Sequence, residues 1–235
     1  MSFLEHLGEL RVRIFRALLA IVFFFMIGWY FSPRIFQFFL APILPFLHGR
    51  KPVFLEITEP FLLYMKVALL AGLFAASPVV LYQLWSFISP GLYPSERRYA
   101  APFIVLSSLF FIGGGLFGYY VAFPYSARFL LSVAEDFEPA LTIRSLFQFE
   151  SKLILAMGLI FEMPVAIFIL AKVGIVTPAF LLRNFKYAVL VIFIVAAIIT
   201  PTPDVITQCV FALPMVALYL LGLGASYLVR PRARS

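Results

Sequence analysis

The sequence predicts an all-α, polytopic membrane protein, and three observations carry that prediction. Of the 235 residues, 63% are hydrophobic and only 12% are charged. The mean hydropathy is +1.04, which suits a chain surrounded by lipid. The apolar residues form long unbroken runs instead of alternating with polar ones. Because lipid offers no hydrogen-bond partners to the backbone, spanning segments must be helices or closed barrels, and unbroken runs favour helices.

Six apolar runs predict six transmembrane helices within a single membrane domain, residues 1–235. The fifth run has about fourteen strongly apolar residues, fewer than the ~20 of a full crossing. The segment Thr200–Asp204, with two prolines, predicts a tight turn after it, so we expect short fifth and sixth helices. The predicted spans are Ile14–Phe31, Val67–Ile88, Ala101–Phe123, Leu153–Ala171, Tyr187–Thr200 and Ile206–Val229.

Proline and glycine predict the shape and packing of individual spans. Pro78, Pro164 and Pro214 lie inside spans and are expected to bend them. Gly114 and Gly118 form a G-x-x-x-G pattern in the third span, which indicates close packing against another helix.

Two long connections, Pro33–Leu47 and Tyr125–Phe149, are rich in Phe and Leu but are interrupted by proline or scattered charge. Such stretches suit short interfacial helices that lie on the membrane surface. The alternative is that they are loops whose aromatic residues belong to the interface belt.

The distribution of Lys and Arg predicts the orientation. An even number of spans puts both termini on one side, and that side has eleven Lys and Arg against seven on the other. Since positive residues favour the cytoplasmic side, both termini are expected to be cytoplasmic. The net charge of +7 is then a topology signal and does not indicate nucleic-acid binding.

No pattern for catalysis, metal or cofactor binding is present. The two histidines, His6 and His48, lie in hydrophilic segments without a Cys or carboxylate cluster, and Cys209 is the one cysteine. There is no phosphate-binding loop and no G-x-S-x-G nucleophile elbow. We therefore expect neither an enzyme nor a metalloprotein.

Glu162 is the tenth residue of the run Leu153–Ala171, so its carboxyl group lies near the middle of the membrane. A carboxylate there costs ~2.5–3.5 kcal/mol on insertion scales, so such residues usually mark a functional pathway or contact. Taken alone, Glu162 suits either the proton site of a small-solute transporter or a polar docking point for a partner helix.

The face with eleven basic residues has three acids, Glu5, Glu9 and Glu96, and of these Glu9 and Glu96 lie at the membrane surface. A carboxylate accepts two parallel hydrogen bonds from a guanidinium, so two carboxylates suit a receptor for two arginines on one peptide. The alternative is local pairing, of Glu9 with Arg13 four residues later and of Glu96 with the arginines that follow it.

An ordered set of motifs across nearly the whole chain resembles the TatC family, the multispanning receptors of twin-arginine protein translocation. The extended Leu-Tyr-Gln-x-Trp segment is the most specific of them. The motifs are His6–Arg11 (HLGELR), Leu81–Tyr93 (LYQLWSFISPGLY), Glu96–Arg98 (ERR), Phe161–Pro164 (FEMP) and Thr200–Asp204 (TPTPD).

The resemblance implies a plasma (inner) membrane protein that acts in an oligomeric complex, driven by the proton-motive force, to move folded proteins across the membrane. It implies that the arginines of a twin-arginine signal peptide bind at Glu9 and Glu96. Neighbouring residues would shape that site, and intramembrane polar groups would contact single-span TatA- and TatB-type partners. The residues implied to shape the signal-peptide site are Arg11, Phe87 and Leu92. The intramembrane polar residues implied to contact the partners are Glu162, Thr207 and Gln208.

The remaining alternative is a proton-coupled small-solute transporter that uses Glu162. Transporter folds commonly consist of two similar halves. Residues 1–118 and 119–235 show no convincing repeat, and no second intramembrane charge is predicted beside Glu162. The sequence therefore favours the receptor.

Overall fold

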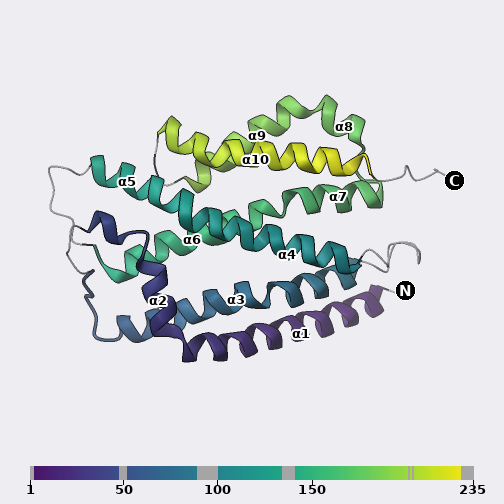
Figure 1. Cartoon of the computed structure of the whole chain (residues 1–235). Helices are drawn as coiled ribbons and strands as arrows, with labels where there is room; N and C mark the ends of the chain where they lie inside the picture. The colour runs from purple at the N-terminus through teal and green to yellow at the C-terminus, as the bar shows by residue number, and fades with distance from the viewer. Residues whose placement is uncertain are drawn as a thin grey trace. The chain divides into compact units, whose positions relative to one another are not determined.

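The computed structural model describes residues 3–47, 52–88, 100–133, 141–200, 202 and 204–228. These residues are mainly helical, which confirms the all-α prediction (Figure 1). In chain order the helices are α1 (Phe3–Tyr30), α2 (Ser32–Leu40), η1 (Leu44–Phe46), α3 (Glu59–Ile88), α4 (Ala100–Phe117), the π-helical turn η4 (Gly118–Ala122), α5 (Phe123–Val133), α6 (Ile143–Phe161), α7 (Met163–Val173), α8 (Pro178–Arg183), α9 (Phe185–Ile199) and α10 (Val205–Ser226).

The apolar helices agree with the six predicted spans. Four helical stretches are each long and apolar enough to cross a membrane, and the pair α1 and α2, which meet at 83°, forms a fifth candidate. The shorter apolar helix α9, which corresponds to the fifth predicted span, completes the set of six candidates. The four stretches are Glu59–Phe87, Ala101–Val133, Ile143–Val173 and Val205–Ser226.

The last two helices differ in length. Helix α9 has 15 residues, so it is short as predicted, at ~22 Å for a rise of ~1.5 Å per residue. The prediction of a short sixth helix is wrong, because α10 has 22 residues and continues through Pro214. Asp204, the residue before α10, determines where the helix begins, but it does not limit its length.

The two long connections fold differently from each other. In the first, α2 and η1 are short helices as predicted, and proline stands in the first turn of each. In residues 125–149 the expected interfacial helices are wrong: α5 continues the third span to Val133 and α6 begins the fourth at Ile143. The π-helical turn η4 joins α4 to α5 without interruption, so the apolar residues after it extend the helix.

The chain divides into two compact units. Unit 1 comprises Met1–Ile112 and Ala140–Ser151, and unit 2 comprises Gly113–Pro139 and Lys152–Ser235. The prediction of one domain over residues 1–235 stays a prediction.

Unit 1 is built on the packing of α1 against α3 (Figure 1). Two glycines allow the backbones to approach closely. A Cβ on Gly28 would lie 2.9 Å from the Ala68 carbonyl oxygen, and one on Gly72 would lie 2.8 Å from the Phe25 nitrogen. Because Phe25 precedes Gly28 while Gly72 follows Ala68, the two helices run antiparallel.

Unit 2 contains a second close packing, which confirms the prediction from the G-x-x-x-G pattern. A Cβ on Gly114 would lie 2.7 Å from Phe161 Cβ, and one on Gly118 would lie 2.8 Å from Ile154 Cα. Both contacts are with α6, so the glycines of the third span allow the fourth span to pack closely against it. Helix α10 packs against α7, where Gly222 lies close to Ile167.

Pro164 stands at a break between α6, which ends at Phe161, and α7, which begins at Met163, while a bend there stays a prediction. Pro164 has no N–H to donate to the carbonyl four residues before it, so the helical ladder is interrupted there. Just before the proline, the Glu162 nitrogen donates to the Leu159 oxygen at 3.2 Å, three residues back and not the four of an α-helix. The break therefore places Glu162 directly before α7.

The glycine packing predicts that Gly118→Ala destabilises the protein. The added Cβ meets backbone, which cannot rotate away, so we expect a loss of about 1–3 kcal/mol. Thermal unfolding of the purified protein in detergent measures it. Gly113→Ala is the matched control, because a Cβ there meets nothing within 4 Å. An equal melting temperature for the two variants would contradict the packing argument.

Candidate functional site

Glu9 lies near the start of α1 and is paired with Arg13. Arg13 Nε donates to Glu9 Oε1 at 3.0 Å, and Nη2 contacts the same oxygen. Both side chains are about one-fifth exposed. The local i,i+4 pair that the spacing allows is therefore formed on Oε1, and Glu9 Oε2 is buried. Arg11 is exposed on the same helix.

The antiparallel register of α1 and α3 brings Glu9 to the level of Phe87. Gly28 lies opposite Ala68, and Phe25 lies opposite Gly72. Continued along both helices, this register puts the first turns of α1 beside the last turn of α3, as Figure 1 shows. Two predicted site residues, Glu9 and Phe87, thus belong to one end of the helix pair.

The end of α3 is held in place by aromatic packing. Trp85 is 4% exposed and packs against Phe103 of α4, with the ring centroids 4.1 Å apart. Phe87, two residues later, is half-buried. The predicted site residues Leu92 and Glu96 lie outside the described residues, although they follow directly in the chain.

Glu162 occupies the break in the fourth span, within Ile143–Val173. It precedes α7, but its side chain makes no capping hydrogen bond to that helix. Its carbonyl oxygen accepts from the Ala166 nitrogen at 2.9 Å, so the backbone of α7 starts regularly. The residue is half-buried, which places a carboxyl group inside a candidate span as the sequence predicts.

Thr207 and Gln208 have intramolecular roles at the start of α10. Gln208 Nε2 donates to the Phe193 carbonyl oxygen at 3.0 Å, which ties α10 to α9. Thr207 is 3% exposed, and its nitrogen donates to Asp204 Oδ1 at 2.6 Å. Their contact with partner helices stays a prediction.

Asp204 is a helix cap, whereas the sequence pattern predicts it only as the end of a turn. It stands in extended conformation before α10, and its side chain accepts from the first turn. An acid directly before an apolar run is the usual signal of such a cap. Burial alone would raise the pKa of Asp204, but hydrogen bonds led by that from the Thr207 N–H outweigh it, so the pKa is lowered.

The sequence as a whole was compared with known families, proteins and structures. A family model described as "Sec-independent protein translocase protein (TatC)" matches residues 5–214. The chain belongs to the TatC family. The resemblance inferred from the motifs is thereby confirmed.

Named relatives support the membership over the full length. The TatC of Koribacter versatilis (strain Ellin345) is 47% identical over 100% of this TatC-family chain and 88% of its own length. The TatC of Desulforapulum autotrophicum is 41% identical over 94% and 82%. Two solved structures titled "Twin Arginine Translocase Receptor- TatC", one of them in DDM, are 36% identical. Their TM-scores are 0.78 and 0.81, and they cover 95% and 96% of this chain and 98% and 99% of their own.

Membership in the TatC family agrees with the prediction of a non-enzymatic, multi-span membrane protein. The alternative of a proton-coupled solute transporter has no support from these comparisons. The family's named role, protein translocation, is the one that the motifs imply.

The cap at Asp204 generates a prediction about stability. Asp204→Ala should destabilise the protein by about 1 kcal/mol, because it removes the acceptor for the Thr207 N–H, whereas Asp204→Asn should keep most of the stability. Thermal unfolding in detergent compares the three proteins.

The same cap predicts a pH dependence. Because the pKa of Asp204 is lower in the folded protein, its stabilisation is present above the ordinary pKa and is lost as the pH falls through the lowered one. Asp204→Asn should lack this component. Identical acid profiles for the wild type and Asp204→Asn would contradict it.

Proposed function

We propose that this chain is the signal-peptide receptor of a twin-arginine translocation system. The single observation that carries the proposal is membership in the TatC family over nearly the full chain. The solved relatives are titled as twin-arginine translocase receptors. Folded precursor proteins would be its cargo, with the proton-motive force as the energy source.

Glu9 and Glu96 are proposed to bind the two arginines of the signal peptide, in a site shaped by Arg11, Phe87 and Leu92. The pair between Glu9 and Arg13 supports this in one respect: the carboxylate already accepts a guanidinium at 3.0 Å. A signal arginine would replace Arg13 in the same hydrogen-bond geometry, so binding is an exchange of partners. Such an exchange avoids leaving the carboxylate unpaired.

Glu162, Thr207 and Gln208 are proposed to help position single-span TatA- and TatB-type partners in an oligomeric complex. A carboxyl group inside a span is most stable against protein or water, so a partner helix that covers Glu162 lowers its cost. Since Gln208 Nε2 bonds the Phe193 carbonyl, its side-chain oxygen is the atom that a partner would use.

The chain is proposed to lie in the plasma (inner) membrane with both termini in the cytoplasm. Six spans put the termini on one side, and the excess of Lys and Arg in the connections on that side favours the cytoplasm. This orientation places Glu9 and Glu96 where a signal peptide is first met.

The arginine-binding proposal predicts that Glu9→Gln and Glu96→Gln each reduce site-specific crosslinking to a signal peptide. The reduction should be about tenfold or more, because hydrogen bonds to charged groups contribute ~1.5–3 kcal/mol. The peptide carries a photo-crosslinker next to its Arg-Arg pair, and the receptor is in membrane vesicles.

Arg13→Gln is the control, since it removes the local partner of Glu9 but keeps the carboxylate. We expect its crosslinking to be equal to or stronger than that of the wild type. If the Glu9→Gln and Glu96→Gln variants crosslink like the wild type while inserted normally, the two acids are not the arginine site.

The partner-docking proposal predicts that Glu162→Gln retains most transport and that Glu162→Ala loses more. Glutamine keeps the hydrogen-bonding capacity of a neutral carboxyl group, and alanine removes it. Export of a twin-arginine substrate by cells that carry each variant is the measurement. Equal loss in both variants would point to proton transfer by Glu162 instead.

A further inference from the structure

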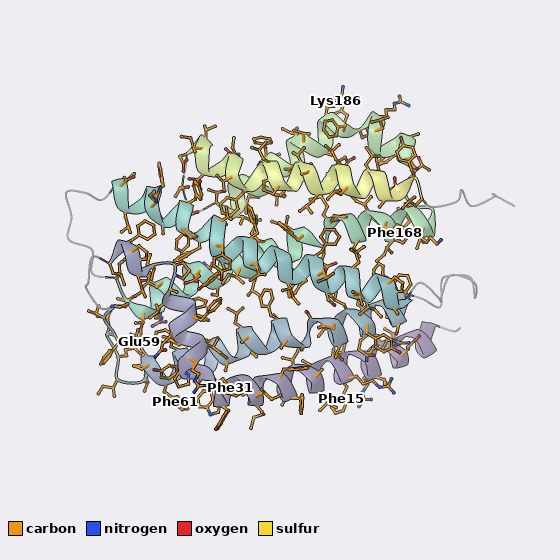
Figure 2. All side chains as sticks on the ribbon, in the orientation of Figure 1. Phe15, Phe31, Glu59, Phe61, Phe168 and Lys186 are labelled. Carbon is orange, nitrogen blue, oxygen red and sulfur yellow. The ribbon has the colours of Figure 1, made fainter. Side chains whose placement is uncertain are left out.

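A pocket of about 130 Å³ lies in unit 1 where α3 and α6 begin, and it belongs to none of the sites above. One wall is a stripe on α3 with helical spacing: Glu59, Leu62, Leu63 and Lys66. The other wall is the first turns of α6, with Ile143, Arg144 and Phe147, and Glu56 lies at the rim. Figure 2 shows Glu59 near the start of α3.

The pocket is held together by pairing between two distant connections. Val53 N donates to the Leu141 oxygen at 3.0 Å, and Ile143 N donates to the Val53 oxygen at 2.9 Å. Of the lining residues, Leu63 and Ile143 form a buried apolar cluster with Val67, and Phe147 packs against that cluster. The walls are therefore fixed by backbone hydrogen bonds and by this apolar cluster.

The four charged groups are ordered along the pocket. Glu56 and Arg144 are more than half exposed and lie 3.6 Å apart at the rim. Glu59 is 7% exposed, and its Oε2 accepts from the Leu55 nitrogen at 2.8 Å. Lys66 lies seven residues further along α3, about 10 Å deeper into the span. Within the described parts of the chain, Lys66 forms no ion pair and Glu59 Oε1 no hydrogen bond.

This order matches a zwitterionic phospholipid headgroup. Both α3 and α6 begin candidate spans here, so the pocket lies at a membrane boundary. In such a headgroup the ammonium lies outermost and the phosphate lies nearer the hydrocarbon. A lysine inside a span extends towards the headgroups and needs an anion, and a buried carboxylate needs a donor. Leu62 is 39% exposed and Phe61 beside it 60%, so acyl chains can lie along α3.

We propose that this pocket binds a phospholipid whose headgroup carries a primary ammonium beside its phosphate, as in phosphatidylethanolamine. Lys66 binds the phosphate, Glu59 Oε1 accepts from the ammonium, and the Glu56–Arg144 pair closes the rim. An anionic headgroup without an ammonium offers no charged donor to Glu59 Oε1. A quaternary ammonium cannot donate a hydrogen bond and needs an aromatic cage, which Phe147 alone does not supply. The proposal does not depend on signal-peptide binding.

Native mass spectrometry of the purified full-length protein tests it, with phosphatidylethanolamine, phosphatidylcholine or phosphatidylglycerol added at equal concentration. We expect phosphatidylethanolamine to be retained preferentially. Lys66→Gln and Glu59→Gln should each lower its retention roughly fivefold or more, because each removes a charge-assisted contact. Arg34→Gln is the control, because it removes the same charge from α2, outside the pocket.

If Glu59→Gln fails to fold, Glu56→Gln replaces it in the test, since Glu56 is exposed. Glu56→Gln should lower the retention of phosphatidylethanolamine by a smaller factor. Soluble glycerophosphoethanolamine should compete only weakly if the acyl chains contribute, and full competition would assign the site to the free headgroup. Equal retention of the three lipids, or wild-type retention in both Lys66→Gln and Glu59→Gln, overturns the proposal.

A photo-crosslinking amino acid in place of Leu62 distinguishes a lipid from a polypeptide. In cells, the expected adduct has the mass of one phospholipid. A polypeptide adduct at this position would show that a protein partner occupies the pocket and would overturn the proposal.

Discussion

Peptide N–H and C=O groups in the hydrocarbon of a bilayer have no water to bond, and each unpaired group costs several kcal/mol. Much of this structure follows from that constraint. The spans are helices because a helix pairs its backbone internally. Near helix ends, local acceptors pair the backbone N–H groups: Glu162 N donates to the Leu159 oxygen beside the Pro164 break, and Asp204 Oδ1 accepts from Thr207 N in the first turn of α10. The Gln208 side chain is paired as well, because its Nε2 donates to the Phe193 carbonyl oxygen of α9. Polar side chains that are available for partners are therefore found mainly at ends and breaks of helices.

Close packing by glycine is the second requirement, because in lipid there is little hydrophobic force between helices. Each unit has its own glycine contacts: Gly28 and Gly72 join α1 to α3, and Gly114 and Gly118 join the third span to α6. In unit 1 the contact also sets the register that brings Glu9 level with Phe87. The candidate receptor site at that end thus depends on two residues with no polar chemistry. A side chain at either glycine would change the site from a distance of several helical turns.

Local signals explain what could be predicted from the sequence. Hydropathy predicted the six spans, and the Gly114–Gly118 spacing predicted the close packing. Pro164 marked where the fourth span is interrupted. Each of these signals depends only on residues that are neighbours in the sequence. Residues 125–149 were mistaken for a surface connection because Arg128 and Arg144 resemble loop charges, although they lie on helices that extend the spans. The pocket could not be predicted, because the pairing of Val53 with Leu141 and Ile143 joins segments nearly ninety residues apart. Single-sequence reasoning has no local signal for such a contact.

The Glu9–Arg13 pair also bears on how a receptor of this kind would tune affinity. An acid held beside a basic helix without a partner would attract any cation, whereas an acid already paired yields only to a better ligand. A lone incoming arginine exchanges one guanidinium for another and gains little, because partly exposed ion pairs contribute ~1 kcal/mol or less. Two adjacent arginines gain more, since the second binds as an intramolecular event once the first is placed. Local pairing and arginine recognition are therefore compatible. The Glu9–Arg13 pair weakens the binding of peptides with a single arginine, and peptides with two adjacent arginines bind more tightly.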